Sequence, residues 1–474
     1  MNRPWDRRSP RQQHRVQSLV LSQWIPAAAA FSPFWGAYFA TARVDPGTIT
    51  SPERLRRLPP LRERDILDAE GYGSPALLLR PTEDQVKARA SLATLWRIAR
   101  EMRSGGTGGK LLALLREYKP IHLHPSGRDG GLTIAYSRSD LDRLHRLGAR
   151  AAAVLGLDQA DYLVSAVPAD GTLAFWGVYH LALGASLLAV HARGTGQGLA
   201  VVAPAFRLVP ATAVAVPVGE AIALPEILAR AEVDLDRLAT VVLVGPPPSP
   251  GERNLIAEAW RAAGAVGNVR VAALWAPPGA RALWAECGQG VADGTSSGLH
   301  TYPDLEVVEL VDPATRRPVP AGGDLTYTSA GWHGTGLIRY QTGDYAAGLL
   351  TGACSACGRT VPRVQPEIAP GAWEPELRGE ERPVRVDLRG AAAALTADPA
   401  VDAWLLEVRG PTERRPRDEY VVMLAGQLDS SRLVDLDRRL AAAVGRPPLQ
   451  LIVEDRELVE GDIMNVGGAF IDAR

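Results

Sequence analysis

Residues 337–344 read Leu-Ile-Arg-Tyr-Gln-Thr-Gly-Asp, and a second distinctive stretch, Cys354-Ser-Ala-Cys357-Gly358, follows shortly after. The second stretch has the form of a metal-binding knuckle, because Gly358 allows the chain to turn tightly after two cysteines spaced as CxxC. Two thiolates at this spacing can ligate one Zn²⁺ ion. The alternative interpretation is a pair of exposed, reduced cysteines without a metal.

The bulk composition is that of a globular protein. The chain has 474 residues, of which 46% are hydrophobic and 22% charged, and this length predicts two or more domains. The 52 Lys and Arg residues almost balance the 53 Asp and Glu residues. The longest apolar runs are far shorter than the roughly 20 residues that span a bilayer. Because no basic field exists to attract phosphates or anionic lipids, we predict no nucleic-acid partner and no membrane partner.

The N-terminal region superficially looks like a secretion signal, with basic residues before the fairly apolar residues 19–31. Ser22 and Gln23 interrupt the apolar run, Pro26 would break its helix, and no convincing cleavage site follows. The three cysteines of the chain are too few for a disulfide framework, and the CxxC pair suits a reducing compartment. We therefore expect a cytoplasmic protein.

Short apolar strands alternate with helical stretches from residue 161 onward. The pattern predicts strands at 162–168, 199–203 and 240–244 and helices at 174–183 and 252–263. Such alternation is typical of a parallel sheet covered by helices on both faces. We therefore predict an α/β fold, with a large N-terminal domain of mostly parallel sheets and covering helices.

A change of composition divides the chain near residue 365. Residues 366–383 are rich in Pro, Glu and Gly and are interpreted as a linker. Residues 384–474 show the pattern strand, helix, strand, helix, strand, which predicts a small α+β C-terminal domain. The expected organisation is therefore an N-terminal domain over residues 1–365, the linker, and the small domain over residues 384–474.

Several motifs, in the right order, resemble those of the phenylacetate–CoA ligase family of adenylate-forming enzymes. The family joins an aryl or acyl carboxylate to ATP and then to coenzyme A. The resemblance therefore implies an AMP-dependent synthetase-like N-terminal domain, ATP with Mg²⁺, CoA and a small carboxylic acid as partners, and a homodimer. The segments that carry it are residues 31–35, 136–141, 244–250, 285–287, 298–300, 311–323, 337–344 and 354–359.

Within this resemblance, Asp344 holds the position of the ribose-binding carboxylate, and the small Gly343 permits close approach of the backbone. An ionised Asp can accept both ribose hydroxyl protons. The alternative is that Asp344 caps a turn or pairs with Arg339, a further nucleotide-binding candidate on the same segment. Trp275 can stack on the adenine base, although a core Trp needs no ligand.

The phosphate loop departs from the family pattern at its centre. Arg128 and Asp129 replace the two central hydroxyl residues. Arg128 could pair with a phosphate, whereas Asp129 would repel one. The alternative is an ordinary polar turn. The positions that do match the pattern are Ser126, Gly127, Gly130 and Thr133.

Other groups that the family uses are replaced. Pro278 and Gly279 stand where the family has a hydroxyl residue and a glutamate, and Val466 stands at the catalytic lysine. The glycine-rich residues 104–110 end in Lys110 and look locally like a phosphate loop, but a flexible connector between helices is the simpler interpretation. Because removing one preorganised donor typically costs about 10²–10³ in rate, these departures argue against efficient adenylation.

The resemblance also extends the metal site beyond Cys354 and Cys357. Cys287 and His300 belong to two further motifs, which approach the knuckle in the fold that the chain resembles. Three cysteines and one histidine would form a closed, structural zinc site that staples loops together and does no chemistry. The alternative is a buried Cys287 and a surface His300.

The remaining histidines carry less information. His122 and His124 alternate around Leu123, as residues of a strand would, and His333 lies beside Trp332. None of these patterns identifies a catalytic base.

Three functional hypotheses follow. The first is an ATP-dependent acyl- or aryl-CoA ligase, in which Arg128 or Lys110 replaces the missing cations. The second is a catalytically inactive relative that keeps the scaffold and binds a ligand or a protein. The third is a zinc-stapled binding domain unrelated to ligases. The order of the motifs favours the first hypothesis, and the replaced residues favour the second.

Overall fold

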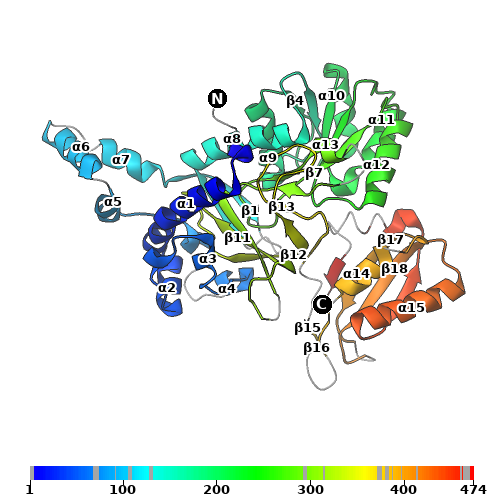
Figure 1. The fold of residues 1–474 in the computed structure, drawn as a ribbon. Coiled ribbons are helices and arrows are strands. Elements are labelled where there is room, and N and C mark those ends of the chain that lie inside the picture. Colours follow the sequence, from blue (N-terminus) through cyan, green and yellow to red (C-terminus); the bar gives the residue numbers. More distant parts are fainter. Residues whose placement is uncertain are drawn as a thin grey trace. The chain divides into compact units, whose positions relative to one another are not determined.

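A twelve-stranded sheet runs through the first part of the chain in the computed structural model (Figure 1). Its strand order is β10-β11-β12-β13-β9-β8-β7-β6-β5-β3-β4, and β14 (Ile368–Pro370) pairs with β12 beside this path. The central strands run parallel to one another. They are β3 (Tyr162–Ser165), β4 (Leu188–His191), β5 (Ala213–Pro217), β6 (Thr240–Val244) and β7 (Arg270–Trp275).

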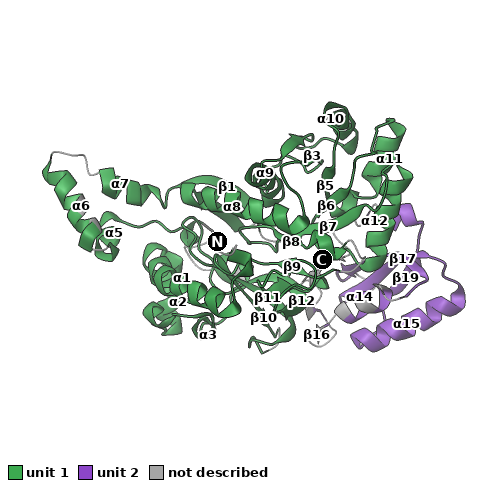
Figure 2. Cartoon of the chain, turned by 45° about the horizontal axis from the view of Figure 1, so that its top comes forward, with its two compact units in different colours: residues 1–368 green, residues 369–474 purple. Residues whose placement is uncertain are grey.

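The contacts divide the chain into two units, Met1–Ile368 and Ala369–Arg474, which are coloured separately in Figure 2. The structure describes residues 5–67, 74–90, 92–104, 109–126, 132–291, 296–312, 315–370, 376–378, 384–386, 388–396, 398–412, 415–459, 462 and 470–473.

Helices cover both faces of the parallel strands. Val214 and Val216 of β5 pack with the apolar faces of α10, α11 and α12, whereas Ala213 and Ala215 pack with those of α8 and α9. Successive residues of a strand point to opposite faces, so both faces of β5 are buried. The predicted α/β fold is confirmed. The helices are α8 (Arg138–Leu155), α9 (Leu173–Ala185), α10 (Ala203–Leu208), α11 (Ala223–Arg230) and α12 (Pro250–Ala262).

The predicted helices at 174–183 and 252–263 are confirmed as α9 and α12, but the predicted strand at 199–203 is wrong. Residues Leu199–Val202 form a short 3₁₀ helix that leads into α10. Pro204 lies in the first turn of α10, where its missing N–H has no helical partner to lose. An apolar run alone does not distinguish a buried strand from a buried helix.

Antiparallel strands extend the sheet on the side where the candidate site lies. The two N-terminal helices α1 (Pro10–Phe31) and α2 (Pro33–Ala42) pack against them in one hydrophobic core (Figure 1). A separate hairpin, β1 (Pro120–Ser126) with β2 (Leu132–Ser137), precedes α8. The antiparallel strands are β8 (Trp284–Glu286), β9 (Leu299–His300), β10 (Glu306–Val311), β11 (Ala321–Ser329), β12 (Tyr340–Leu350) and β13 (Arg363–Val364).

Five α-helices lie between α2 and β1 in the described part of the chain. They are α3 (Pro52–Leu55), α4 (Glu63–Leu67), α5 (Glu83–Arg89), α6 (Leu92–Arg103) and α7 (Gly109–Arg116). None of the helices in the described part of the chain combines the length and the apolar character that crossing a membrane requires.

The second unit contains a four-stranded sheet with the order β19-β18-β17-β20. The strands β17 and β18 are antiparallel, and β19 and β20 add in parallel at the two edges. Leu436 and Leu440 of α15 (Ser430–Val444) and Leu395 of α14 (Arg389–Thr396) pack into one core with the sheet. The strands are β17 (Val401–Arg409), β18 (Glu419–Gly426), β19 (Gln450–Val453) and β20 (Phe470–Ala473).

Candidate functional site

The end of β1 and the turn after β7 meet, although more than a hundred residues separate them in sequence. The Oγ of Ser126 accepts a hydrogen bond of 2.8 Å from the backbone N–H of Gly279. Gly279 has a φ of 80°, and a Cβ at this position would lie 2.8 Å from the ring of Tyr340. Only glycine fits there, because both its left-handed conformation and the close ring exclude a side chain. Two motifs from the sequence analysis are therefore in direct contact.

Asp344 lies on an irregular part of β12. The pairing of β11 with β12 shifts register between Asp324 and Thr326, so the segment around Gly343 bulges out of the ladder. Gly343 has a φ of 78°, and the N–H of Asp344 donates to the Oγ1 of Thr342 at 3.2 Å. The side chain is only 5% exposed. The Thr-Gly-Asp sequence therefore fixes the direction of one carboxylate, a common use of a bulge beside a functional site.

Arg339 is buried and makes its hydrogen bonds within the protein. Its Nε donates to a carboxylate oxygen of Glu309 at 3.1 Å, and its Nη1 donates to the carbonyl of Leu58. The side chain is buried, and its φ of 47° is uncommon for a residue other than glycine. Its guanidinium therefore connects the N-terminal segment with the antiparallel strands, and we interpret it as a residue that positions the following Thr-Gly-Asp segment.

Trp275 and Thr133, two further nucleotide-binding candidates, lie in regular structure. Trp275 ends β7, is half-buried, and meets Trp284 edge to face with 5.9 Å between the ring centroids. Thr133 lies in β2 opposite Pro125. The candidates Gly127, Arg128 and Gly130 lie outside the described residues, as do Asp129 and Val466.

Lys110 ends the glycine-rich segment 104–110 and lies in the first turn of α7. Its side chain is exposed, and its backbone N–H donates to a carboxylate oxygen of Glu101 at 3.0 Å. Residues 105–108 lie outside the described part of the chain. The described contacts of Lys110 are those of a connection between α6 and α7.

A buried cation that the sequence did not single out lies beside this region. Arg281 is fully buried, with its guanidinium 4.7 Å from the ring centroid of Tyr136 and 4.9 Å from that of Trp332. Its Nη2 lies 3.6 Å from the carboxylate of Asp140, which also accepts backbone N–H groups of the loop after Trp332. No local pattern reveals such a residue, because its partners come from distant segments. Arg281 holds the turn after β7 against β2.

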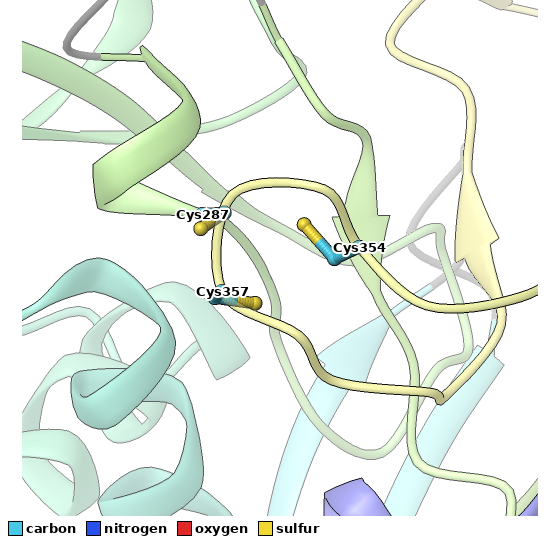
Figure 3. Close-up of side chains that lie close together, drawn as sticks. All are labelled: Cys287, Cys354 and Cys357. Carbon is cyan, nitrogen blue, oxygen red and sulfur yellow. The ribbon is translucent and has the colours of Figure 1, made fainter.

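The three cysteines of the chain gather at one point (Figure 3). Cys354 and Cys357 lie on the loop after β12, and Cys287 follows β8 directly. Their sulfur atoms lie within 4.8 Å of one another, and all three residues are buried. Sulfurs at this spacing can close around one ion with metal–sulfur bonds of about 2.3 Å. The cysteine triad therefore has the arrangement that a metal requires.

His300 lies next to this triad. Its Nε2 is 3.4 Å from the sulfur of Cys357, and its Nδ1 is 3.4 Å from the carbonyl oxygen of Ala285. The tautomer with its proton on Nδ1 donates to this carbonyl and turns the lone pair of Nε2 toward the thiols, the usual arrangement of a ligating histidine. With a proton on Nε2, the ring donates to the cysteine sulfurs instead. The expectation that His300 lies on the surface is excluded, because the residue is 1% exposed.

The electrostatics of the triad favour thiolates. A hydrogen bond from Cys287 lowers the pKa of Cys357 to about 2, and the same contact together with burial raises the pKa of Cys287. Burial opposes ionisation of Cys354, but hydrogen bonds from His300 and Ser297 prevail and lower its pKa to about 6. The site therefore favours negative charge on its sulfurs, which a divalent cation would neutralise.

A buried ion pair fixes the strand that leads to Cys287. Both guanidinium nitrogens Nη1 and Nη2 of Arg253 donate to Glu286, at 3.0 to 3.2 Å, and the N–H of Ala273 donates to the same carboxylate at 2.7 Å. Arg253 comes from α12 and Glu286 from β8. Glu286 directly precedes Cys287, so the pair holds the backbone of one metal-ligand candidate in place.

The fold of this chain matches that of solved CoA ligase structures. Two solved structures of 2-hydroxyisobutyryl-CoA ligase match nearly the whole chain. The postadenylation state with R3-HIB-AMP has a TM-score of 0.66 and 17% identity and covers 97% of this chain and 93% of that chain. The open conformation with 2-HIB-AMP and CoA has a TM-score of 0.64 and 17% identity and covers 94% of this chain and 89% of that chain.

A curated relative is also similar to this chain in sequence. A segment of 168 residues is 31% identical to the phenylacetate–coenzyme A ligase of Thermus thermophilus. The match spans 35% of this chain and 32% of that protein, about a third of each. No family model matches the chain. The resemblance seen in the motifs is thus supported by a distant sequence match and by the fold.

Proposed function

We propose that this protein activates a carboxylic acid with ATP to form an acyl adenylate and then transfers the acyl group to CoA. The observation that carries the proposal is the carboxylate of Asp344, held on a bulge of β12 in a fold that 2-hydroxyisobutyryl-CoA ligase uses with an acyl-AMP ligand. The small-molecule partners in this proposal are a carboxylic acid, ATP with Mg²⁺, and CoA.

The residues present fit parts of an ATP site. The carboxylate of Asp344 can accept the hydrogen bonds of two ribose hydroxyls. The Oγ of Ser126 accepts the Gly279 N–H, so its own proton remains available to donate to a phosphate oxygen. Thr133 adds a second hydroxyl, and Arg128 supplies the cation in this proposal. Trp275 offers a ring face for the base.

A second candidate function rests on the turn after β7. Pro278 and Gly279 offer no carboxylate for Mg²⁺, and the ring of Tyr340 fills the space beside Gly279. A chain that keeps Asp344 but lacks these groups would serve as a scaffold that binds a nucleotide, an acyl-CoA or a protein without turnover.

One assay separates the two candidates. The purified protein is incubated with ATP, Mg²⁺, CoA and a panel of aryl and fatty acids, and the release of AMP and pyrophosphate is followed. The ligase proposal predicts release that depends on one class of acid. No turnover with any acid, together with no ATP binding in a calorimeter, would contradict it. ATP binding without turnover would support the scaffold instead.

We further propose that the cysteine triad and His300 hold one structural Zn²⁺ ion. Four ligands of this kind make a closed tetrahedral site that leaves no position for substrate. Metal analysis of the purified protein should give about one equivalent of zinc, and replacing Cys354 with Ser should remove most of it. Ser355→Ala, in the same loop but exposed, is the control and should keep the zinc. Less than half an equivalent in the unmodified protein, or full zinc in Cys354→Ser, would contradict the site.

The cytoplasmic location and the homodimer stay predictions of the sequence. Size-exclusion chromatography with light scattering would test the dimer directly.

A further inference from the structure

A cluster of histidine and aromatic side chains lies where β1, β2 and α9 meet. We define the His–aromatic cluster as His122, His124, Tyr136, Trp176 and His180. The ring of His122 is 4.5 Å from that of Trp176 and 6.1 Å from that of His124, between centroids. The rings of His124 and Tyr136 are 5.3 Å apart, and those of Trp176 and His180 are 6.1 Å apart. The cluster therefore forms one continuous group of rings.

The cluster concentrates polar atoms that are buried and unpaired. His124 is 1% exposed and His180 is 8% exposed. Neither ring nitrogen of either residue has a hydrogen-bond partner in the described part of the chain, and the same holds for the Nε1 of Trp176 and the Nε2 of His122. Leaving one such group unpaired costs roughly 1–3 kcal/mol, and native proteins contain few of them. Several at one place indicate a site that a ligand with polar groups completes.

The imidazoles of the cluster are neutral. Burial, with the charge of Arg281 and the neighbouring His122, lowers the pKa of His124 to about 3. Burial, with His145 and His122 nearby, lowers the pKa of His180 to about 4. A neutral imidazole offers one N–H donor and one nitrogen acceptor. The cluster can therefore both donate to and accept from the same small group, as a hydroxyl requires, and it does not attract an anion.

A metal ion does not account for the cluster. Among the described residues, the one group of His, Cys, Asp and Glu close enough together to hold a metal is the cysteine triad. The rings of the cluster instead present apolar faces beside their polar atoms, which suits an aromatic ligand.

The cluster adjoins the proposed activation site through its own backbone. His122 and His124 share β1 with Ser126, whose Oγ is bound to Gly279. On the other side, Phe175 of α9, the neighbour of Trp176, packs in the same core as Ala276 in the turn that leads to Gly279. An acid with its carboxylate beside Ser126 would therefore direct its other end toward the cluster.

We infer that the His–aromatic cluster recognises the ring of the acid substrate and selects aryl carboxylates that carry a ring hydroxyl. The hydroxyl donates to one unpaired imidazole nitrogen and accepts from an N–H of the cluster, while the aryl ring packs among the aromatic side chains. This inference rests on the proposed function, because it names the substrate class of that site.

The test is binding of two matched acids to the protein without ATP. Isothermal calorimetry compares 4-hydroxyphenylacetate with phenylacetate, and 6-hydroxyhexanoate provides an aliphatic comparison. One satisfied hydrogen bond predicts that 4-hydroxyphenylacetate binds about tenfold more tightly or better than phenylacetate. The aliphatic hydroxy acid should bind more weakly than the hydroxylated aryl acid. Equal affinities for the two aryl acids, no binding of either, or tighter binding of the aliphatic acid would overturn the inference.

Variants assign the preference to the cluster. His124→Phe and His180→Phe keep an aromatic ring and remove the polar atoms, so each should bring the two affinities close together while phenylacetate binding is retained. His14→Phe, the same change at an exposed histidine on α1, is the control and should keep the preference. A preference that survives in both cluster variants would contradict the inference. In the unmodified protein, ¹⁵N signals of buried imidazoles should shift with 4-hydroxyphenylacetate and not with phenylacetate, which gives a readout that needs no variant.

The binding test and the activity test fail independently. Selective binding of 4-hydroxyphenylacetate without any AMP release would leave the inference standing and remove the proposed ligase activity. Equal activation of both aryl acids would support the ligase activity and overturn the inference about the ring hydroxyl.

Discussion

At the scale of single residues, Glu306 is a carboxyl that the fold keeps out of water. The residue is 2% exposed, and one of its carboxylate oxygens accepts hydrogen bonds from the Nε1 of Trp284 at 2.8 Å and from the N–H of Tyr302 at 2.7 Å. Burial outweighs these bonds and raises the pKa of Glu306 to about 8. The native protein therefore holds this carboxyl as a neutral acid near pH 7.

Glu306→Gln should stabilise the protein at pH 8 and have little effect near pH 4.5. Between these values the native state keeps a proton that the unfolded state has lost, so the contribution of Glu306 to stability falls as the pH rises. The glutamine side chain does not ionise, so this loss of stability with rising pH disappears. Its amide oxygen can still accept the hydrogen bonds from Trp284 and Tyr302. We expect a gain of a few kcal/mol at pH 8. Urea unfolding at both pH values measures it, and an equal effect of the substitution at both would contradict the assignment.

Some contacts between single residues could be predicted from the sequence, and others could not. The gathering of Cys287 and His300 with the CxxC pair followed from recognising motifs, and the structure places these side chains together. Arg281, Arg253 and the pairing of Arg339 with Glu309 could not be foreseen, because each depends on a partner brought close only by folding. The roles of Asp344, Ser126 and Thr133 in nucleotide binding stay predictions.

At the scale of elements, α8 and α9 approach so closely that their contact depends on glycine. A Cβ on Gly148 would lie 2.2 Å from the carbonyl oxygen of His180, and one on Gly184 would lie 2.4 Å from that of His145. Because backbone atoms stand in the way, one helix would have to shift to admit a methyl group. The same contact positions His180, which belongs to the His–aromatic cluster.

Gly148→Ala should destabilise the protein by about 1–3 kcal/mol or more, since it overpacks this helix contact. Gly251→Ala in α12 is the matched control, because no atom lies within 4 Å of a Cβ there. The control should be neutral or gain up to about 1 kcal/mol from its higher helix propensity. Thermal and urea unfolding of the two variants compare them. Equal stability of both would show that α8 and α9 can separate without cost.

The type of an element was predictable where the spacing of apolar residues and the capping residues agreed. An example is α12, whose N-cap residue Ser249 forms a capping box with Glu252. The type was not predictable at residues 199–203, where a short apolar run suits a strand and a helix equally well. The bulge at Gly343 was not predicted, because the register shift that defines it depends on the partner strand β11.

At the scale of the whole molecule, the proposed zinc site joins segments that are far apart in the chain. Cys287 follows β8, His300 lies in β9, and the CxxC pair follows β12, all within the unit Met1–Ile368. A metal bound only by the folded state adds its binding free energy to stability, on the order of 10 kcal/mol apparent for structural zinc. The site would therefore hold the sheet of the first unit together.

Removing zinc with a chelator should lower the melting temperature of the first unit strongly and reversibly. The second unit contains none of the three cysteines, so its unfolding transition should not move. Differential scanning calorimetry with and without 1,10-phenanthroline measures both transitions, and added Zn²⁺ should restore the first. An unchanged first transition in chelator, after metal analysis has shown that zinc is gone, would rule out the stapling role.

The central claim is that the retained carboxylate of Asp344 serves carboxylate activation with ATP. The most direct measurement is the acid-dependent release of AMP from ATP, Mg²⁺ and CoA by the unmodified protein and by Asp344→Ala, with the exposed Asp142→Asn as the control. The account predicts release with an aryl acid, a loss of about 10² or more in Asp344→Ala, and no loss in the control. No AMP release with any acid, or the same release in Asp344→Ala, would contradict it.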